Sequence, residues 1–132
     1  MTVKHLDLLT LPDEINIKLP ASKSISNRVL ILNALAYSPY DVQNLANCDD
    51  TNVLVKVLNS NDRIFDIGAA GTSMRFLTAF LSKTMGEWTI TGSERMKNRP
   101  IALLVDALNS LGARIEYIEK EDNLHWKGLN GI

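Results

Sequence analysis

Two short patterns occur twice in this chain, in the same order and at nearly the same spacing. The pattern S-x-R-x-L at residues 26–30 returns at 73–77, and L-V-x-x-L-N-S at 54–60 returns at 104–110. Because both fall on expected helices, they indicate one supersecondary unit used twice, with chance similarity between leucine-rich helices as the alternative. Such a unit cannot usually bury its apolar helical face alone, so we expect partners or further copies.

Apolar periodicity and turn residues divide the chain into alternating strands and helices. The expected strands are residues 15–19, 41–45, 64–67, 87–91, 114–118 and 124–127. The expected helices are residues 24–37, 53–58, 73–82 and 101–111. We expect Asp49, Asp50 and Thr51 to supply N-cap chemistry for the second helix and Gly112 to end the last one. The remaining residues are expected to be loops, among them 92–100 and the charged turn 119–123. This alternation predicts an α/β fold.

Length, charge and cysteine content limit the class of protein. The 132 residues fit one domain with a substantial core, and 45% apolar with 22% charged residues is ordinary for a soluble globular protein. The net charge of −1 argues against a dominant role in binding nucleic acid or an anionic membrane. The single cysteine, Cys48, excludes an internal disulfide. Residues 1–12 contain no continuous apolar run, so we expect no signal peptide, no membrane helix and a cytoplasmic location.

Residues 19–36 place several anion-binding groups at the start of one helix. Lys23 and Ser24 lie in a small-residue turn after Pro20, and Arg28 lies in the first turns of the helix. A helix start attracts anions through its free N–H groups and its dipole, and arginine can grip a phosphate or carboxylate with two hydrogen bonds. The segment is therefore a candidate anion clamp, although a serine-capped helix with two solvated cations explains it as well.

Two further strand-to-helix junctions have related chemistry. Residues 68–75 (GAAGTSMR) carry glycines that let backbone N–H groups approach an anion, but the segment is neither a Walker P-loop nor a dinucleotide fingerprint. Residues 92–100 (GSERMKNRP) hold Arg95, Lys97 and Arg99, and Pro100 suits position N1 of the next helix. An ordinary turn and a solvated charge cluster are the alternatives. If the repeats stack in one orientation, all three junctions line one cleft.

The sequence offers no credible metal or triad site. His5 and His125 are far apart, and no Cys/His cluster has the spacing of metal ligands. Asp49 and Asp50 could supply a general base, but an N-cap role is the stronger interpretation. The expected ligands of the chain are therefore small anions.

Together the three motifs resemble the 5-enolpyruvylshikimate-3-phosphate synthase family. The matching segments are LPASKSISNRVLILNALA (19–36), GAAGTSMRFLTA (68–79) and TGSERMKNRPIALLVDALNSLGARIEY (91–117), and the resemblance runs from about residue 15 to the end. It implies repeated βαβαββ units of an inside-out α/β barrel, with helices inside and sheets outside. About two units are present, at 19–67 and 68–132 in a partial N-terminal domain, and residues 1–18 are associated with a second domain.

The resemblance also implies a reaction and a set of binding residues. The family transfers the enolpyruvyl group of phosphoenolpyruvate to the 5-hydroxyl of shikimate 3-phosphate, on the route to chorismate and aromatic amino acids, without a metal or organic cofactor. By motif, Lys23, Ser24 and Arg28 would bind shikimate 3-phosphate. Phosphoenolpyruvate would be held by Lys23, Gly71, Thr72 and Arg99. The family's proton-transfer residues fall mostly beyond this chain, so no catalytic residue is assigned.

The chain departs from the family in three ways. Ala69 stands where most members have asparagine, and the short span between residues 54–60 and Gly68 indicates that a hairpin common in the family is trimmed. Family members are also much longer, with two domains that close over the substrates. We therefore expect a fragment that is inactive alone and that self-associates, whereas the whole enzyme is expected to be a monomer. The alternatives are a relative of UDP-N-acetylglucosamine enolpyruvyl transferase and a non-catalytic anion-binding module of the same fold.

Overall fold

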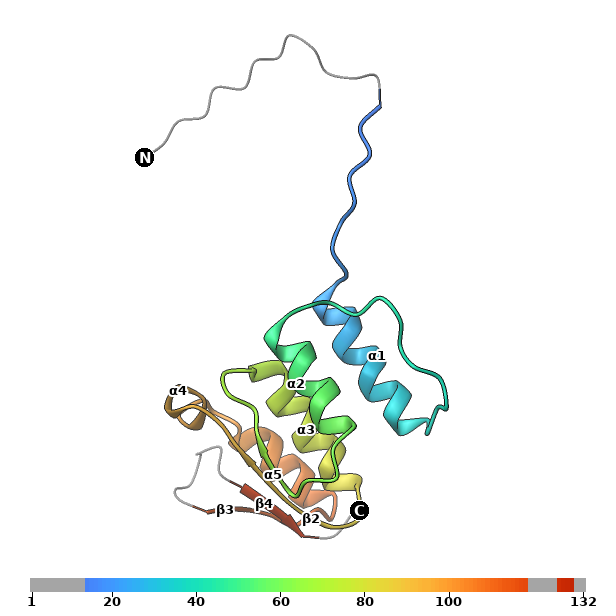
Figure 1. Ribbon diagram of the computed structural model, residues 1–132. Coiled ribbons are helices and arrows are strands. Elements are labelled where there is room, and N and C mark those ends of the chain that lie inside the picture. The colour runs from blue at the N-terminus through green and yellow to red at the C-terminus, as the bar shows by residue number, and fades with distance from the viewer. Residues whose placement is uncertain (1–13, 119–125, 130–132) are drawn as a thin grey trace, which may run out of the picture.

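The computed structural model describes residues 14–118 and 126–129. Its helices are α1 (Lys23–Leu35), α2 (Asp49–Leu58), α3 (Gly71–Lys83), the short α4 (Glu94–Lys97) and α5 (Ala102–Ser110). Its strands are β1 (Ile64–Asp66), β2 (Glu87–Thr91), β3 (Ile115–Tyr117) and β4 (Trp126–Leu129). Helices α1, α2, α3 and α5 lie on one side of the sheet, with α1 farthest from it (Figure 1). The α/β class predicted from the sequence is confirmed.

The four strands form one mixed sheet in the order β1-β2-β4-β3. Strands β1 and β2 are parallel, with Phe65 opposite Ile90, because α3 crosses over between them. Strand β4 is antiparallel to both β2 and β3. Residues 68–132 thus supply three of these strands, and β1, which lies before them in the chain, pairs with β2.

Helix α3 lies at the centre of the structure and packs against α1, α2, α5 and strand β2. Its inward side chains Met74 and Leu77 have no exposed surface, and neither have Leu54 of α2 and Ile90 of β2. These residues belong to one continuous apolar cluster that reaches Val105 of α5. Burial of this cluster fixes α3, and therefore its N-terminus, relative to the other helices. Within the described residues, no helix has the length and apolarity needed to cross a bilayer.

The predicted strand at residues 15–19 is wrong. Ile15, Ile17 and Leu19 are 58% to 79% exposed, and the segment is not part of a sheet. Alternation of apolar residues favours a strand only where a neighbouring strand supplies backbone partners. Within the described residues, no strand lies beside this segment to supply them.

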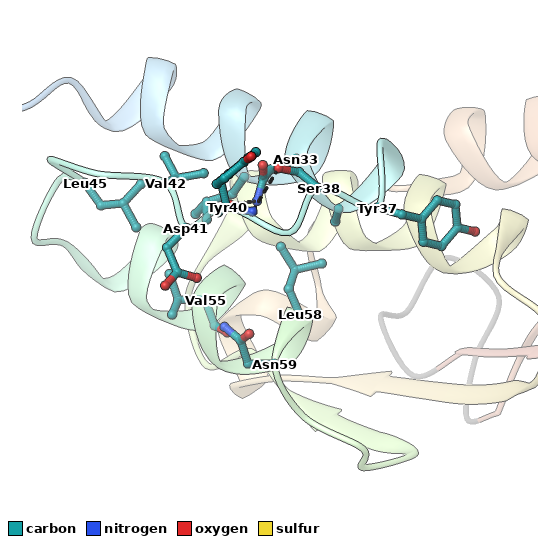
Figure 2. A pocket seen from close by; sticks show the side chains of 12 residues that line it. Asn33, Tyr37, Ser38, Tyr40, Asp41, Val42, Leu45, Val55, Leu58 and Asn59 are labelled. Atoms are coloured by element: carbon teal, nitrogen blue, oxygen red, sulfur yellow. Dashed lines mark hydrogen bonds between the residues drawn. The ribbon is translucent and has the colours of Figure 1, made fainter.

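The predicted strand at residues 41–45 is also wrong. Asn44 adopts a left-handed conformation with φ of 54°, which interrupts an extended strand. The segment instead covers the outer side of α1 and α2, where the Asn33 side chain donates to the Tyr40 carbonyl at 3.0 Å. A cavity of about 370 Å³ remains beneath it, and Figure 2 shows Val42, Leu45, Val55 and Leu58 around this cavity while Tyr37 points away.

The predicted helices and the other strands are confirmed, with boundaries that differ by a few residues, and β2 matches its predicted range. Gly112 follows α5 with φ of 102°, as expected of a residue that ends a helix. The predicted turn 119–123 and the first residues of the predicted strand 124–127 lie outside the described residues.

Three local predictions about helix starts are corrected. Residues 92–100 are not wholly a loop, because Ser93 caps the single turn α4 by accepting from the Met96 N–H at 3.3 Å. The N-cap of α2 is Cys48, so Asp49 and Asp50 are its first two helical residues. Pro100 precedes the α5 N-cap, Ile101, and is therefore not at N1.

Candidate functional site

A pocket of about 310 Å³ lies where the starts of α1, α2 and α3 meet the segment before α5. It is lined by Lys23, Asp50, Ala69, Gly71, Thr72, Arg75, Phe76 and Arg99. Four of the predicted site residues, Lys23, Gly71, Thr72 and Arg99, are among them, so the structure brings together groups from all three predicted junctions. Three cations and one carboxylate leave the lining with an excess of two positive charges.

Lys23 is the first residue of α1, which begins there because Ser22 accepts from the Ile25 N–H at 3.4 Å. The Lys23 ammonium donates to Oδ2 of Asp50 at 3.3 Å, and its side chain is 49% exposed. An ammonium has three donors, so this bond leaves two for a ligand.

Gly71 is the buried first residue of α3, and the Arg99 guanidinium lies directly against it. A Cβ added at Gly71 would collide with Nη1 of Arg99. Glycine is therefore needed here for close approach. The absence of a side chain allows the Arg99 guanidinium to lie beside the N-terminus of α3, which is the positive end of the helix dipole. The guanidinium and the helix N-terminus can then bind the same anion.

Arg75 holds the segment that carries Arg99 against α3. Its Nη1 donates to the Gly71 carbonyl and its Nη2 to the Pro100 carbonyl, both at 3.1 Å. The corresponding residue of the first unit, Arg28, makes the same bond one turn back, to the Ser24 carbonyl at 3.0 Å. The repeated S-x-R pattern thus has a repeated structural use.

The first turn of α3 is already occupied by a carboxylate. Oδ1 of Asp50 accepts from the Thr72 N–H at 3.0 Å and from the Ser73 N–H at 3.2 Å. The Thr72 backbone is therefore engaged within the protein, and its half-buried side chain is the part that lines the pocket.

Ser24 and Arg28 do not line this pocket. Arg28 instead borders a neighbouring apolar groove between α1 and α3, where its guanidinium lies 5.6 Å from the centre of the Phe76 ring. Phe76 lines both depressions. The two groups of predicted site residues thus lie on adjacent surfaces that share this aromatic ring.

The three cations of the predicted third junction have separate positions. Arg99 lines the pocket, whereas Arg95 is exposed on α4, and the Lys97 ammonium lies 3.4 Å from the Glu94 carboxylate. The described residues contain no cluster of three or more His, Cys, Asp or Glu side chains that could hold a metal ion. Within the described part of the chain, the pocket is suited to an anion through cations and backbone donors.

The predicted ligand set omits the two other charged residues that line the pocket, Asp50 and Arg75. Arg75 belongs to the repeated S-x-R pattern, so the repeat itself was the available signal. Asp50 was interpreted as an N-cap of its own helix, but its carboxylate caps α3 instead. That contact joins residues 22 positions apart, and local pattern carries no sign of it.

Comparisons with known proteins agree with this geometry. The profile of the family described as EPSP synthase (3-phosphoshikimate 1-carboxyvinyltransferase) matches residues 12–61 and 56–131. The 3-phosphoshikimate 1-carboxyvinyltransferase of Bacteroides fragilis strain YCH46 is 56% identical over 116 residues, 86% of this chain and 28% of the relative. The enzyme of the same name from Ralstonia pickettii is 40% identical over 145 residues, 90% of this chain and 33% of the relative.

Among solved structures, the EPSP synthase from Acinetobacter baumannii superposes with a TM-score of 0.75 at 18% identity, over 87% of this chain and 32% of that one. This likeness shows the enolpyruvyl transferase fold, with only part of it present. The chain spans about 30% of the length of the curated relatives it matches. With the family profile covering nearly all of its sequence, the chain belongs to the EPSP synthase family.

Proposed function

We propose that this chain is part of an enzyme that transfers the enolpyruvyl group of phosphoenolpyruvate to the 5-hydroxyl of shikimate 3-phosphate. The observation that carries the proposal is the single pocket in which Lys23, Gly71, Thr72 and Arg99 meet. The family membership and the names of its relatives support these two substrates as the ligands of the pocket.

On the phosphoenolpyruvate side, the proposed ligands are Lys23, Gly71, Thr72 and Arg99. Phosphoenolpyruvate carries a phosphate and a carboxylate, and the pocket has an excess of two positive charges. Arg99 can hold a phosphate or a carboxylate with two parallel hydrogen bonds, and Lys23 adds a point charge with spare donors. The Thr72 hydroxyl would supplement them, because its backbone N–H is engaged by Asp50.

On the shikimate 3-phosphate side, the proposed ligands are Lys23, Ser24 and Arg28. These residues are exposed on the first turns of α1, next to the pocket. The Arg28 bond to the Ser24 carbonyl uses one of five guanidinium donors and leaves the others for a phosphate. Lys23 would therefore lie between the two substrates and contact both.

The chemistry that such a site supports needs stabilised anions rather than a cofactor. Phosphoenolpyruvate gains a proton at its methylene carbon while the 5-hydroxyl oxygen bonds to the adjacent carbon and loses its proton. The tetrahedral intermediate then loses phosphate from the central carbon and one proton from the new methyl group, which forms the enol ether of the product. Fixed cations and N–H donors stabilise the phosphate charge, most strongly where water is excluded. The residues that move the protons are not assigned within this chain.

The wider organisation follows the family. We propose that residues 19–132 form part of an N-terminal domain, with repeats at about 19–67 and 68–132, and that residues 1–18 belong with a second domain. The proposed setting is the cytoplasm, and the proposed partners are the two small-molecule substrates.

Calorimetric titration tests the proposal with phosphoenolpyruvate, shikimate 3-phosphate and UDP-N-acetylglucosamine as ligands. We expect Lys23→Ala to weaken both of the first two ligands, and Arg99→Ala to weaken phosphoenolpyruvate, by about tenfold or more. Lys56→Ala is the matched control, because Lys56 is an exposed cation on α2 away from the pocket. Binding of the nucleotide sugar alone, or equal losses in the control, would contradict the proposal.

Turnover requires proton-transfer groups in addition to the groups that bind the substrates. Because the chain covers 28% and 33% of the two relatives named above, we expect no phosphate release when both substrates are supplied to the 132-residue chain alone. A coupled phosphate-release assay measures this directly. Sustained release above a control without protein would show that the chain holds its own proton-transfer groups.

A further inference from the structure

Asp50 is an acid in a pocket that is otherwise suited to anions. It lines the pocket together with Lys23, Arg75 and Arg99, and only 16% of its side chain is exposed. A carboxylate in this position repels an incoming phosphate. Two sets of contacts made by Asp50 account for its presence.

The first reason is that α3 lacks a side-chain cap of its own. Its N-cap residue is Ala70, which has no side-chain acceptor. Oδ1 of Asp50 takes over this role from α2, accepting from the Thr72 and Ser73 N–H groups at 3.0 Å and 3.2 Å. The Ser73 hydroxyl adds a bond of 2.6 Å to the Asp50 carbonyl. A negative charge at this end of a helix is also favoured by the helix dipole.

The second reason is that the same carboxylate holds Lys23. Oδ2 accepts from the Lys23 ammonium at 3.3 Å, so one side chain joins the starts of α1, α2 and α3. About half of the Lys23 side chain is exposed, and solvent screening therefore limits what this ion pair contributes to stability. The ion pair still orients the Lys23 ammonium, because it restricts the conformations of a long and flexible side chain.

We propose that Asp50 is a positioning residue that acts as a built-in anion at the α3 N-terminus. Its carboxylate blocks the Thr72 and Ser73 N–H groups and aims Lys23 into the pocket. An external anion is thereby confined to Lys23, Gly71, Arg99 and the Thr72 hydroxyl. The identity of that anion rests on the proposed function, whereas the occupation of the helix start by Asp50 does not.

The first test uses formate, which is the carboxylate group that Asp50→Ala removes. We expect Asp50→Ala to lower the melting temperature by about 3–6 °C through loss of the cap. Sodium formate should restore at least about half of this loss, whereas sodium chloride at the same ionic strength should not. Asp49→Ala, at the exposed neighbouring acid, should respond to neither salt. Equal responses of Asp50→Ala to formate and chloride would overturn the proposal.

The second test locates inorganic phosphate by amide NMR titration. In the wild-type chain, phosphate should shift the Gly71 amide strongly and the Thr72 and Ser73 amides weakly. In Asp50→Ala the last two amides should become the most strongly shifted, and phosphate should bind about fivefold more tightly because a like charge has left. Strong wild-type shifts at Thr72 and Ser73, or none in the variant, would overturn the proposal.

If Asp50→Ala does not fold, Asp50→Asn is the variant that tests the proposal. Asparagine retains a neutral oxygen that can accept from Thr72 and Ser73, so the melting temperature should stay near that of the wild type. Phosphate should still bind more tightly than it binds the wild type, and the Thr72 and Ser73 amide signals should still shift only weakly. Weaker or unchanged phosphate binding would overturn the proposal. A failure of phosphoenolpyruvate to bind the wild type, with formate rescue intact, would count against the proposed function alone.

Discussion

Gly71 and Arg99 lie directly against each other in the pocket, so the residue type at 71 affects where the Arg99 guanidinium can lie. The guanidinium lies in the space that a side chain at residue 71 would occupy. It is the far end of a flexible side chain, so it can move at little cost when that space is filled. Residue 71 therefore controls the position of a ligand-binding cation more than it controls the stability of the fold.

The first prediction follows from this contact. Gly71→Ala should push the Arg99 guanidinium away from the α3 start and weaken phosphoenolpyruvate binding by about tenfold. The melting temperature should change little, because alanine is favoured over glycine at a helical position. Calorimetric titration and thermal melting of the same sample measure the two effects.

Gly68→Ala is the matched control for that experiment. Gly68 has φ of 55° and open space where a Cβ would lie, so the substitution strains the backbone without touching Arg99. We expect a loss of about 1 kcal/mol in stability and unchanged ligand affinity. If both variants lost affinity equally, the Arg99 contact would not be the reason.

At the scale of the elements, local chemistry predicted helices better than strands. The apolar stripes that place Leu54, Leu77 and Val105 in the core repeat within one or two turns, so the sequence alone could reveal them. The predicted strands at 15–19 and 41–45 are wrong because a strand requires a neighbouring strand as hydrogen-bond partner. Alternation of apolar residues does not show whether such a partner is present. Asp50 was misassigned for a similar reason, since the amides it caps belong to another helix.

The second prediction concerns the loop between β2 and α4. The Ser93 N–H donates to the Gly68 carbonyl at 3.0 Å, and a Cβ at Gly92 would lie 2.7 Å from the same oxygen. Gly92→Ala should cost about 1–3 kcal/mol, because a backbone oxygen cannot move aside as a side chain can. Urea unfolding measures the change.

Leu103→Ala serves as the reference for that measurement. Leu103 is 89% exposed on α5, so its substitution should alter stability by about 0.5 kcal/mol or less. An equally small effect at Gly92 would mean that the loop moves away from Gly68 without cost.

At the scale of the whole molecule, the surface formed by α1 and α3 carries an exposed apolar groove. A groove of about 530 Å³ between α1 and α3 is lined by Ile31, Leu32, Leu35, Phe76, Ala79 and Phe80, with Arg28 and Lys83 beside them. Ile25 and Leu32 are 65% and 63% exposed. Exposed apolar area of this extent favours association, as the repeat pattern predicted.

The third prediction is that the 132-residue chain self-associates through this face. Sedimentation velocity should show a species larger than the monomer that grows with concentration, and Leu32→Glu should reduce it while leaving the melting temperature unchanged. Leu103→Glu, at an exposed leucine on α5, should not reduce it. A sharp monomer at high concentration in the wild type would contradict this expectation.

Arg28 and Arg75, at equivalent positions of the repeated S-x-R pattern, share one backbone contact and differ in another. Arg28 and Arg75 occupy equivalent turns and bond equivalent carbonyls, but only Arg75 also reaches the Pro100 carbonyl. The two copies of the pattern therefore differ in what surrounds a shared contact rather than in the contact itself. Lysine at either position alters the shared bond in the same way, so the difference between Arg75→Lys and Arg28→Lys compares the Pro100 contact of Arg75 with the Phe76 contact of Arg28. We expect that difference to be about 1 kcal/mol in urea unfolding.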